Sequence, residues 1–583
     1  MLYPTLTPLN TSRELIDVFK GYNHNIRIGG GEFFEMTNLS SDNYPLLSPR
    51  PKRGVYESPE APAGLIAKDA LCYVDGADFV IGEQRVPMEL TVDDAQKSLI
   101  SMGAHVIIMP DKKYINTTAK EDGSFEYGDI EASVTTSESV SFALCKADGS
   151  SYGTDIPTQA TAPTEPANLA LWIDTSSVPH ALKQYSASQK TWTSIATTCI
   201  KISSSGIGAP FSEGDGVTLS GIADTALADT LRSAIIQARG DGYIVVKGIL
   251  DKVTTQTAAL TVERKMPNMD FIIESENRLW GCRYGTALNG KIVNEIYASK
   301  LGDFKNWNCF AGIASDSYAV SIGTDGPFTG AVTLGRPLFF KENCMHAVYG
   351  NYPSNFQVQA TSLRGVQKGC ERSLAVVNEI LYYKSRSGVC AYDGSLPVEI
   401  SAALGDVAYH NAVAGALGNK YYISMSDSYG NFHLFVFDTS KGMWHREDGT
   451  QAECFCGFRG DLYFVDHATN QIKTVKGTGM TETVPIKWSA VTGIIGTDSP
   501  DKKYISRMDV RMQLEVGARV AFYAEYDSSG NYEYLFTMTG KSLQSFSVPF
   551  RTRRCDHLRL RIVGTGEAKL FSICKTIEGG SNR

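Results

Sequence analysis

Apolar residues along this chain come in short runs of strand length, separated by glycine, asparagine and aspartate. Residues 272–307 show the pattern most clearly. Their alternation predicts one strand over residues 272–284 and another over residues 292–298, joined by a turn with Gly and Asn and followed by a polar return. Because weaker copies of this unit recur, the chain is predicted to be a repeat of small antiparallel sheets.

The spacing of these units indicates how they are arranged. From Pro337 onward the units start ~40 residues apart, which is the spacing of four-stranded propeller blades. A single such sheet cannot bury both faces, so blades must pack around an axis. We expect an all-β fold built on a β-propeller of about seven blades. The other units are residues 65–86, 99–116, 337–360, 375–400, 420–447 and 456–475.

A long region of different character interrupts the repeat between Asn116 and Ile272. It contains a linker rich in Gly, Ser, Thr and Pro over residues 148–168 and a hairpin pattern over residues 181–198. One helix is predicted over residues 224–239. Its apolar positions share a face, and Asp224 is a suitable N-cap. The region is therefore predicted to be a small, mostly β domain inserted into the propeller.

The two ends of the chain differ from the repeat. Prolines and Gly29-Gly30-Gly31 predict an extended N-terminal arm. Long period-two strands over residues 484–575 predict a C-terminal β-sandwich. The expected division is an arm at 1–54, first blades at 55–119, the inserted domain at 120–265, the remaining blades at 266–478 and the sandwich at 479–583.

Composition narrows the function classes. With 54 Gly, 28 Tyr and 25 Phe in 583 residues, the chain suits turn-rich β structure. A net charge of −8 argues against a protein that coats nucleic acid. The twelve cysteines are scattered, which favours reduced, buried thiols in a chain folded in a cytoplasm. Neither a signal peptide nor a membrane span is visible, so we expect a soluble protein.

Catalytic, cofactor and metal sites are not predicted from motifs. The nine histidines have no metal-binding spacing, although His433 and His445 on adjacent strands could meet. A satisfied or exposed histidine is favoured there. Cys454 and Cys456 are expected on one strand face as core residues. The triple glycine lacks the helix and Lys of a phosphate loop, and residues 466–470 lack the acids of a Ca²⁺ loop.

A basic run over residues 551–562 is the most charged strand. Alternation puts His557, Arg559 and Arg561 on one face and Leu558, Leu560 and Ile562 on the other. A solvated outer face is favoured, and contact with an acidic neighbouring subunit is the alternative. Nucleic-acid binding is not expected, because no aromatic stacking platform accompanies the run.

The chain resembles the β-propeller tail proteins of tailed bacteriophages, the nozzle or tail-stabilisation proteins. The resemblance rests on residues 19–54, on SENRLWGCRYG at 275–285 with NEIYASKLGDFKNW at 294–307, on residues 421–448, and on RRCDHLRLRIVGTGEAKLFSI at 553–573. It implies a structural, non-enzymatic virion protein. Its subunits would form a homo-oligomeric ring, six-fold in nozzles, below the head-to-tail adaptor and beside tail-fibre proteins.

What the resemblance implies for function is a ring that retains phage DNA before ejection and conducts it afterwards. Assembly would take place in the host cytoplasm, and the ring would reside in the virion tail. Within this class the alternative is a tail-tip or fibre-hub component. From another class, the alternative is a glycan-binding or glycan-cleaving propeller, which needs acids and aromatic residues gathered at one site.

Overall fold

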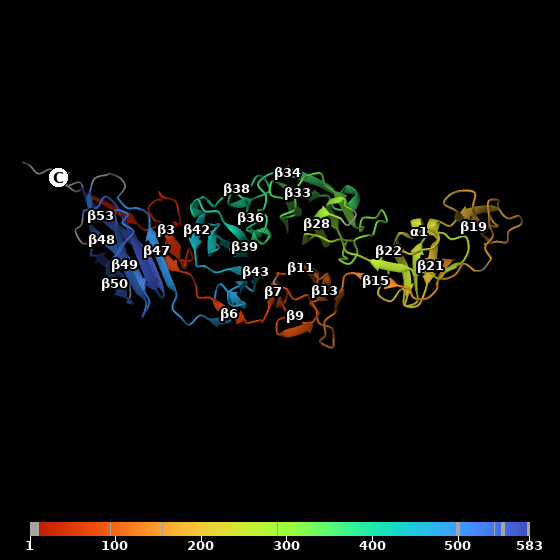
Figure 1. The fold of residues 1–583 in the computed structure, drawn as a ribbon, viewed down its shortest axis with the longest axis horizontal. Helices are drawn as coiled ribbons and strands as arrows, with labels where there is room; N and C mark the ends of the chain where they lie inside the picture. Colours follow the sequence, from red (N-terminus) through yellow and green to blue (C-terminus); the bar gives the residue numbers. More distant parts are fainter. Residues whose placement is uncertain are drawn as a thin grey trace, which may run out of the picture.

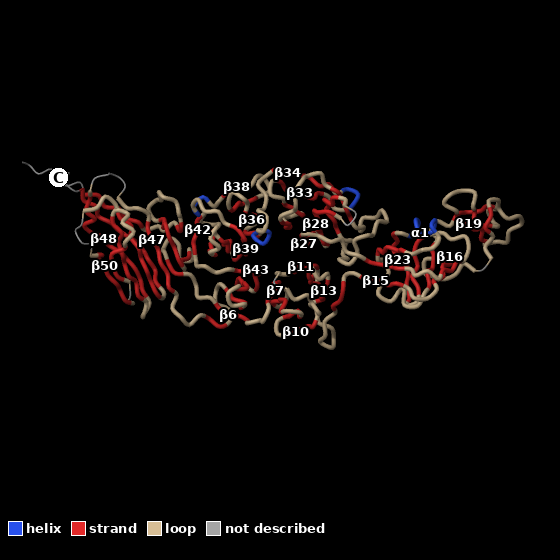
Figure 2. The backbone as a smooth tube through the Cα atoms, viewed as in Figure 1, coloured by secondary structure: helices blue, strands red, loops and turns tan. Residues whose placement is uncertain are grey.

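The computed structural model describes residues 11–93, 95–153, 155–287, 290–496, 502–541, 543–549 and 554–579. Almost all regular structure in these ranges is β, as Figure 2 shows, with α1 (Thr225–Leu231) as their one α-helix. The fold class is therefore all-β, as predicted. No helix within the same ranges is long and apolar enough to cross a bilayer.

Seven sheet units follow one another in the described part of the chain, five of them as separate four-stranded sheets. The first two are β7 (Pro62–Ala67), β8 (Leu71–Asp75), β9 (Asp78–Ile81), β10 (Gln84–Pro87), then β11 (Ser98–Met102), β12 (His105–Met109), β13 (Lys113–Asn116), β14 (Tyr127–Asp129). The next three are β27 (Phe271–Ser275), β28 (Arg278–Thr286), β29 (Ile292–Ala298), β30 (Tyr318–Ser321), then β31 (Gly330–Thr333), β32 (Pro337–Phe340), β33 (Cys344–Tyr349), β34 (Gln357–Ser362), then β35 (Ala375–Val377), β36 (Ile380–Lys384), β37 (Val389–Tyr392), β38 (Val398–Glu399).

The last two units take in strands from the N-terminal segment. The sixth is β39 (His410–Leu417), β40 (Lys420–Ser426), β41 (Phe432–Asp438), β42 (Met443–Arg446), and it continues through β2 (Gly21–Tyr22) into β3 (Glu32–Thr37). The seventh is β43 (Ala452–Phe458), β44 (Asp461–Asp466), β45 (Gln471–Thr474), β6 (Gly54–Glu57), β46 (Met480–Thr481). Thus β6, from before the first unit, is hydrogen-bonded into the last one.

The first strands of most neighbouring units contact one another. β7 contacts both β11 and β43; β27 contacts β11 and β31; β39 contacts β35 and β43. The 3₁₀ turn η2 (Glu371–Ser373) contacts β31 and β39. In Figure 1 these strands surround a common centre. Large buried residues such as Phe79, Phe339 and Phe464 fill the spaces between the sheets.

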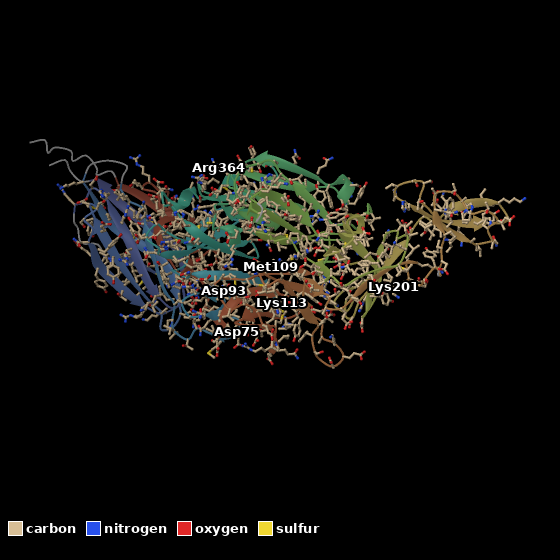
Figure 3. All side chains as sticks on the ribbon, turned by 45° about the vertical axis from the view of Figure 1, so that its right-hand side comes forward. Asp75, Asp93, Met109, Lys113, Lys201 and Arg364 are labelled. Carbon is tan, nitrogen blue, oxygen red and sulfur yellow. The ribbon has the colours of Figure 1, made fainter. Side chains whose placement is uncertain are left out.

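The inserted region is an eight-stranded sheet with a smaller four-stranded one, at one end of the molecule (Figures 1 and 3), where Lys201 lies. Its strands are β15 (Ala132–Thr135), β16 (Val140–Cys145), β21 (Cys199–Ser203), β22 (Gly216–Ser220), β23 (Ser233–Gly240), β24 (Tyr243–Lys247), β25 (Thr254–Gln256), β26 (Thr261–Arg264), and β17 (Thr158–Gln159), β18 (Leu171–Asp174), β19 (Ala181–Ser186), β20 (Thr191–Ser194).

The predicted helix over residues 224–239 is wrong in its second half. Asp224 does cap α1, accepting from the backbone N–H of Ala226 and Leu227. The helix ends at Leu231, and Ser233–Gly240 is strand β23, paired with β22 and β24. β-Branched Ile235 and Ile236 fit this strand better than a second helical turn.

Replacing Asp224 with alanine should destabilise α1 by about 1 kcal/mol, because two backbone N–H groups lose their acceptor. Amide hydrogen exchange in α1 should become roughly fivefold faster, as that free energy implies at local opening. Asp229→Ala is the matched control, since Asp229 is exposed and caps nothing in the described structure. Unchanged exchange in Asp224→Ala would contradict the cap.

Two sheets face each other at the opposite end of the molecule from the insert (Figure 1). One is β1 (Thr11–Ile16), β53 (Ala568–Gly579), β48 (Lys503–Leu514), β51 (Gln544–Val548). The other continues the sixth unit from β3 through β47 (Lys487–Thr492), β52 (Leu558–Thr565), β49 (Arg519–Tyr526), β50 (Tyr532–Thr539). Met508, Val510, Phe522, Leu560 and Ile573 form the core between them. A short pair, β4 (Leu39–Ser40) and β5 (Ser48–Pro49), lies beside it.

The N-terminal segment is not the extended arm expected from its prolines. Residues 1–10 lie outside the described ranges. Beyond them, β1 pairs antiparallel with β53, and β3 pairs with β47. Phe33 and Met36 of β3 are buried in the sandwich core. Apolar side chains at alternating positions therefore place this segment inside two sheets.

Candidate functional site

A polar cluster around Arg372 lies near the starts of β11, β35 and β43. Its guanidinium donates to the backbone carbonyls of Gln96 (3.0 Å) and Glu453 (3.3 Å), which belong to different units. The Glu453 carboxylate lies 2.6 Å from His467 Nδ1. Glycoside hydrolysis needs two carboxyl groups about 5–9.5 Å apart across the scissile bond. Within the described residues of this cluster, one carboxylate, Glu453, forms an ion pair, and its partner is His467.

A broader set of functional groups lies on the outer face of the sheet that joins the sixth unit to the sandwich. Backbone register places Glu35, Val491, Arg561, Tyr523 and Tyr534 side by side across five strands. The neighbouring row is Arg559, Glu525 and Tyr532. Residues in register across antiparallel strands present their side chains to one face. We call these residues, without Val491, the tyrosine–arginine face.

Ring and guanidinium contacts fix the side chains on this face. The Arg561 guanidinium lies 5.4 Å from the centre of the Tyr532 ring, and Tyr523 meets Tyr534 edge to face at 5.7 Å. Arg559 covers one ring, Phe34, at 4.3 Å. Tyr534 is 60% exposed, and Glu35 and Arg561 are exposed as well. Contacts between rings and guanidinium groups hold the side chains in place while leaving their edges open to solvent.

The charges of the face act on a common point. Burial raises the pKa of Tyr532. The carboxylates of Glu525 and Glu35 raise this pKa further, whereas the guanidinium groups of Arg559 and Arg561 lower it. Both carboxylates and both guanidinium groups are therefore close enough to the Tyr532 hydroxyl to act on it. Glu525 accepts from the backbone N–H of Gly530 (2.9 Å), which fixes its position.

Chemically, the tyrosine–arginine face offers flat rings together with hydrogen-bond donors and acceptors. Guanidinium groups donate, carboxylates accept, and tyrosine hydroxyls do both. A ligand with many hydroxyls and apolar C–H surface matches this mixture, because aromatic rings combine apolar faces with polar edges. Carboxylates within the same face oppose a chain of phosphates.

The sequence predicted one part of this face and missed the other. Arg559 and Arg561 do share a face, opposite buried Leu558, Leu560 and Ile562. Residues 551–553 of the basic run lie outside the described ranges. His557 lies before β52 and contacts Asp556 and Ser528. The sequence around the basic run indicates no aromatic platform, but β49 and β50 supply one. The alternating Tyr532 and Tyr534 are the only local pattern in the sequence that indicates it.

The other residues singled out from the sequence do not come together in a site. The register sets His445 opposite Val436, three residues from His433, so these two histidines do not meet. Cys454 and Cys456 pack against a core of Leu71, Tyr73 and Val465, as expected. Within the described ranges, His, Cys, Asp and Glu form no group of three that could hold a metal ion.

Comparison with known proteins yields matches among solved structures alone. No protein-family model matches the chain, and no curated protein does. An exo-β-1,3-galactanase from Phanerochaete chrysosporium is 9% identical, with 52% of this chain and 94% of that one covered and a TM-score of 0.21. A Trypanosoma rangeli sialidase is 8% identical, with 97% and 95% covered and a TM-score of 0.22. A glycoside hydrolase is 12% identical, with 52% and 96% covered and a TM-score of 0.19.

These matches correct two expectations. All three are carbohydrate-active enzymes and none is a tail protein, so the DNA-conducting tail ring and the absence of enzymatic activity are both contradicted. The glycan-directed alternative agrees better with them. At such low TM-scores no residue, substrate or reaction is carried over to this chain. An oligomeric ring, its partners and a location in a virion stay predictions.

Proposed function

We propose that the protein is a β-propeller with an attached β-sandwich that recognises glycans through the tyrosine–arginine face. Two features support the propeller. The first strands of most neighbouring units contact one another, with β7 meeting β43, and β6 joins the last unit to residues that precede the first. Strand exchange of this kind would hold a ring of sheets closed, because each sheet must cover its faces with neighbours.

The observation that carries the glycan proposal is the composition and exposure of one row of side chains. Glu35, Arg561, Tyr523 and Tyr534 span four strand spacings, or about 19 Å. An extended oligosaccharide can lie across such a row, with its C–H faces on the tyrosines and its hydroxyls on the carboxylate and guanidinium groups. A monosaccharide would contact only part of the row.

Glycan-array screening followed by calorimetry with the best oligosaccharide tests the proposal. Tyr534→Ala and Arg561→Ala should each weaken binding about tenfold or more, because each removes a stacking ring or charge-assisted hydrogen bonds. Tyr127→Ala is the matched control, since Tyr127 is 47% exposed on β14, far along the chain from the face. Its affinity should equal that of the unmodified protein.

Chain length and cleavage complete the test. Affinity should rise from disaccharide to tetrasaccharide if the ligand lies along the row. Reducing-end release is measured on the same samples, so that glycan cleavage is recognised directly. The proposed site would be contradicted if the protein bound no glycan, or if the Tyr534→Ala and Arg561→Ala variants bound glycan as tightly as the unmodified protein.

A further inference from the structure

A second feature of the sandwich is a hollow of about 890 Å³ on the opposite sheet, β1–β53–β48–β51. Three arginines line it, Arg13, Arg507 and Arg511. Its carboxylates are Asp509 and Asp17, and serine hydroxyls line the side formed by β51. None of these residues belongs to the tyrosine–arginine face.

Backbone register arranges the hollow as a grid. Arg13 and Arg507 flank Thr576 in one row, and Arg511 lies between Ser572 and Ser545 two rows away. Arg507 and Arg511 are four residues apart in one strand, which separates their Cα atoms by about 13 Å. Asp509 stands midway between them.

The hydrogen bonds use few of the guanidinium donors. Arg507 Nε donates to Asp509 (2.9 Å), and Arg13 Nη2 lies 3.5 Å from the same carboxylate. Arg511 Nε donates to Ser545 Oγ (2.9 Å). Each guanidinium has five N–H donors. Arg13 Nε also donates to Cys574 Sγ (3.1 Å). The contacts made with the described residues therefore still leave most of the donors of the three arginines without a partner there, and Arg13 and Arg507 are exposed to solvent.

Charge and composition together select the ligand class. Asp509 holds Arg13 and Arg507 in place. Burial would raise the pKa of Asp509, but the hydrogen bonds from Ser547 and Arg507 and the charge of Arg13 keep it below the usual range. Leu15, on β1 at the opposite edge of the sheet from the β51 serines, is 59% exposed and offers an apolar surface. The hollow thus presents cationic donors about 13 Å apart, hydroxyls, and one apolar patch.

We propose that this hollow binds an acidic saccharide, with its anionic groups on the arginines and its ring hydroxyls on the serines and Asp509. This inference rests on the proposed function only in that the ligand is a saccharide. A saccharide carries hydroxyls that can donate to Asp509 between its anionic groups, and a DNA phosphodiester backbone has no such donors. Carboxylated and sulfated sugars share the required chemistry.

Calorimetry with three hexasaccharide-size probes tests this inference on the full chain. The probes are oligogalacturonate, a sulfated dextran oligosaccharide and neutral cello-oligosaccharide, with oligo-dT of equal charge for comparison. Arg511→Ala and Arg13→Ala should each weaken binding of an acidic probe about tenfold. Arg386→Ala is the matched control, because Arg386 is exposed on another sheet unit. Whichever acidic probe binds more tightly shows whether the hollow prefers carboxylate or sulfate groups.

The outcomes separate this inference from the proposed function. Loss of acidic-probe binding in Arg511→Ala, with neutral-glycan binding and the Arg386 control unchanged, supports the hollow whatever Tyr534→Ala does. Equal affinity for acidic and neutral probes would overturn it. The inference would also be overturned if both arginine variants kept the affinity of the unmodified protein for the acidic probe. It would be overturned as well if oligo-dT bound as tightly as the acidic probe and depended on the same arginines. Failure of the tyrosine–arginine face would instead appear as neutral-glycan binding that Tyr534→Ala leaves intact.

Discussion

Arg53→Met should lower the free energy of unfolding by about 3 kcal/mol, because buried Glu447 loses its hydrogen-bonded cation and keeps only Arg50, 3.9 Å away. Arg53 Nη2 donates to Glu447 (2.7 Å), whose side chain is 3% exposed, and Nη1 donates to Thr450 (2.7 Å). Although burial alone would raise it, Arg53 holds the pKa of Asp448 at about 2. This network ties the N-terminal segment to the connection between the sixth and seventh units.

Urea unfolding followed by tryptophan fluorescence measures the effect. The double variant Arg53→Met with Glu447→Gln should be less destabilised than Arg53→Met alone, since the uncompensated charge is removed with its partner. Arg364→Met is the control, because Arg364 and its partner Glu399 are 56% and 35% exposed, so their ion pair is solvated. A loss below about 1 kcal/mol in Arg53→Met would show that the network contributes as little as a surface pair.

Acidification should destabilise the protein through two buried histidines. Burial lowers the pKa of His445 and of His346 from 6.5 to about 4, with Lys420 and Lys341 lowering it further. A lowered histidine pKa means that the unfolded chain binds more protons, so stability falls as pH falls. Their full contribution is present above about pH 6.5 and is lost as pH approaches 4. By pH 5 each histidine should cost about 2 kcal/mol.

Unfolding midpoints at pH 7 and pH 5 check this expectation. His445→Gln should flatten the difference between the two pH values, because glutamine does not titrate. His410→Asn is the control, because the His410 side chain is exposed. An identical pH dependence in the unmodified protein and His445→Gln would refute the assignment.

Local alternation predicts much of this fold. The strands of the 272–307 unit, the period-two pattern of the sandwich and the cap at Asp224 all depend on near neighbours in sequence. Which strands pair with one another does not depend on near neighbours in sequence. Nothing in residues 11–16 indicates pairing with residues 573–578, because that contact depends on the whole chain between them.

The same limit explains the sites. Alternation puts Arg559 and Arg561 on one face, but the tyrosines beside them come from β49 and β50, and Glu35 comes from β3. The helix predicted past Leu231 failed for a related reason. Leucine and isoleucine positions there satisfy both a helical and an extended period, and pairing with β24 decided between them.

The pairings of β1 with β53 and of β6 with β45 also have a consequence for biosynthesis. The ribosome makes β6 before any sheet unit, yet its partner emerges some four hundred residues later. β1 waits for β53, the last strand that the structure describes. At about 5–20 residues per second, these early strands stay unpaired for roughly half a minute or more. The nascent chain must keep them from wrong partners, and a message cut short before β53 would yield a protein whose first strand never finds its place.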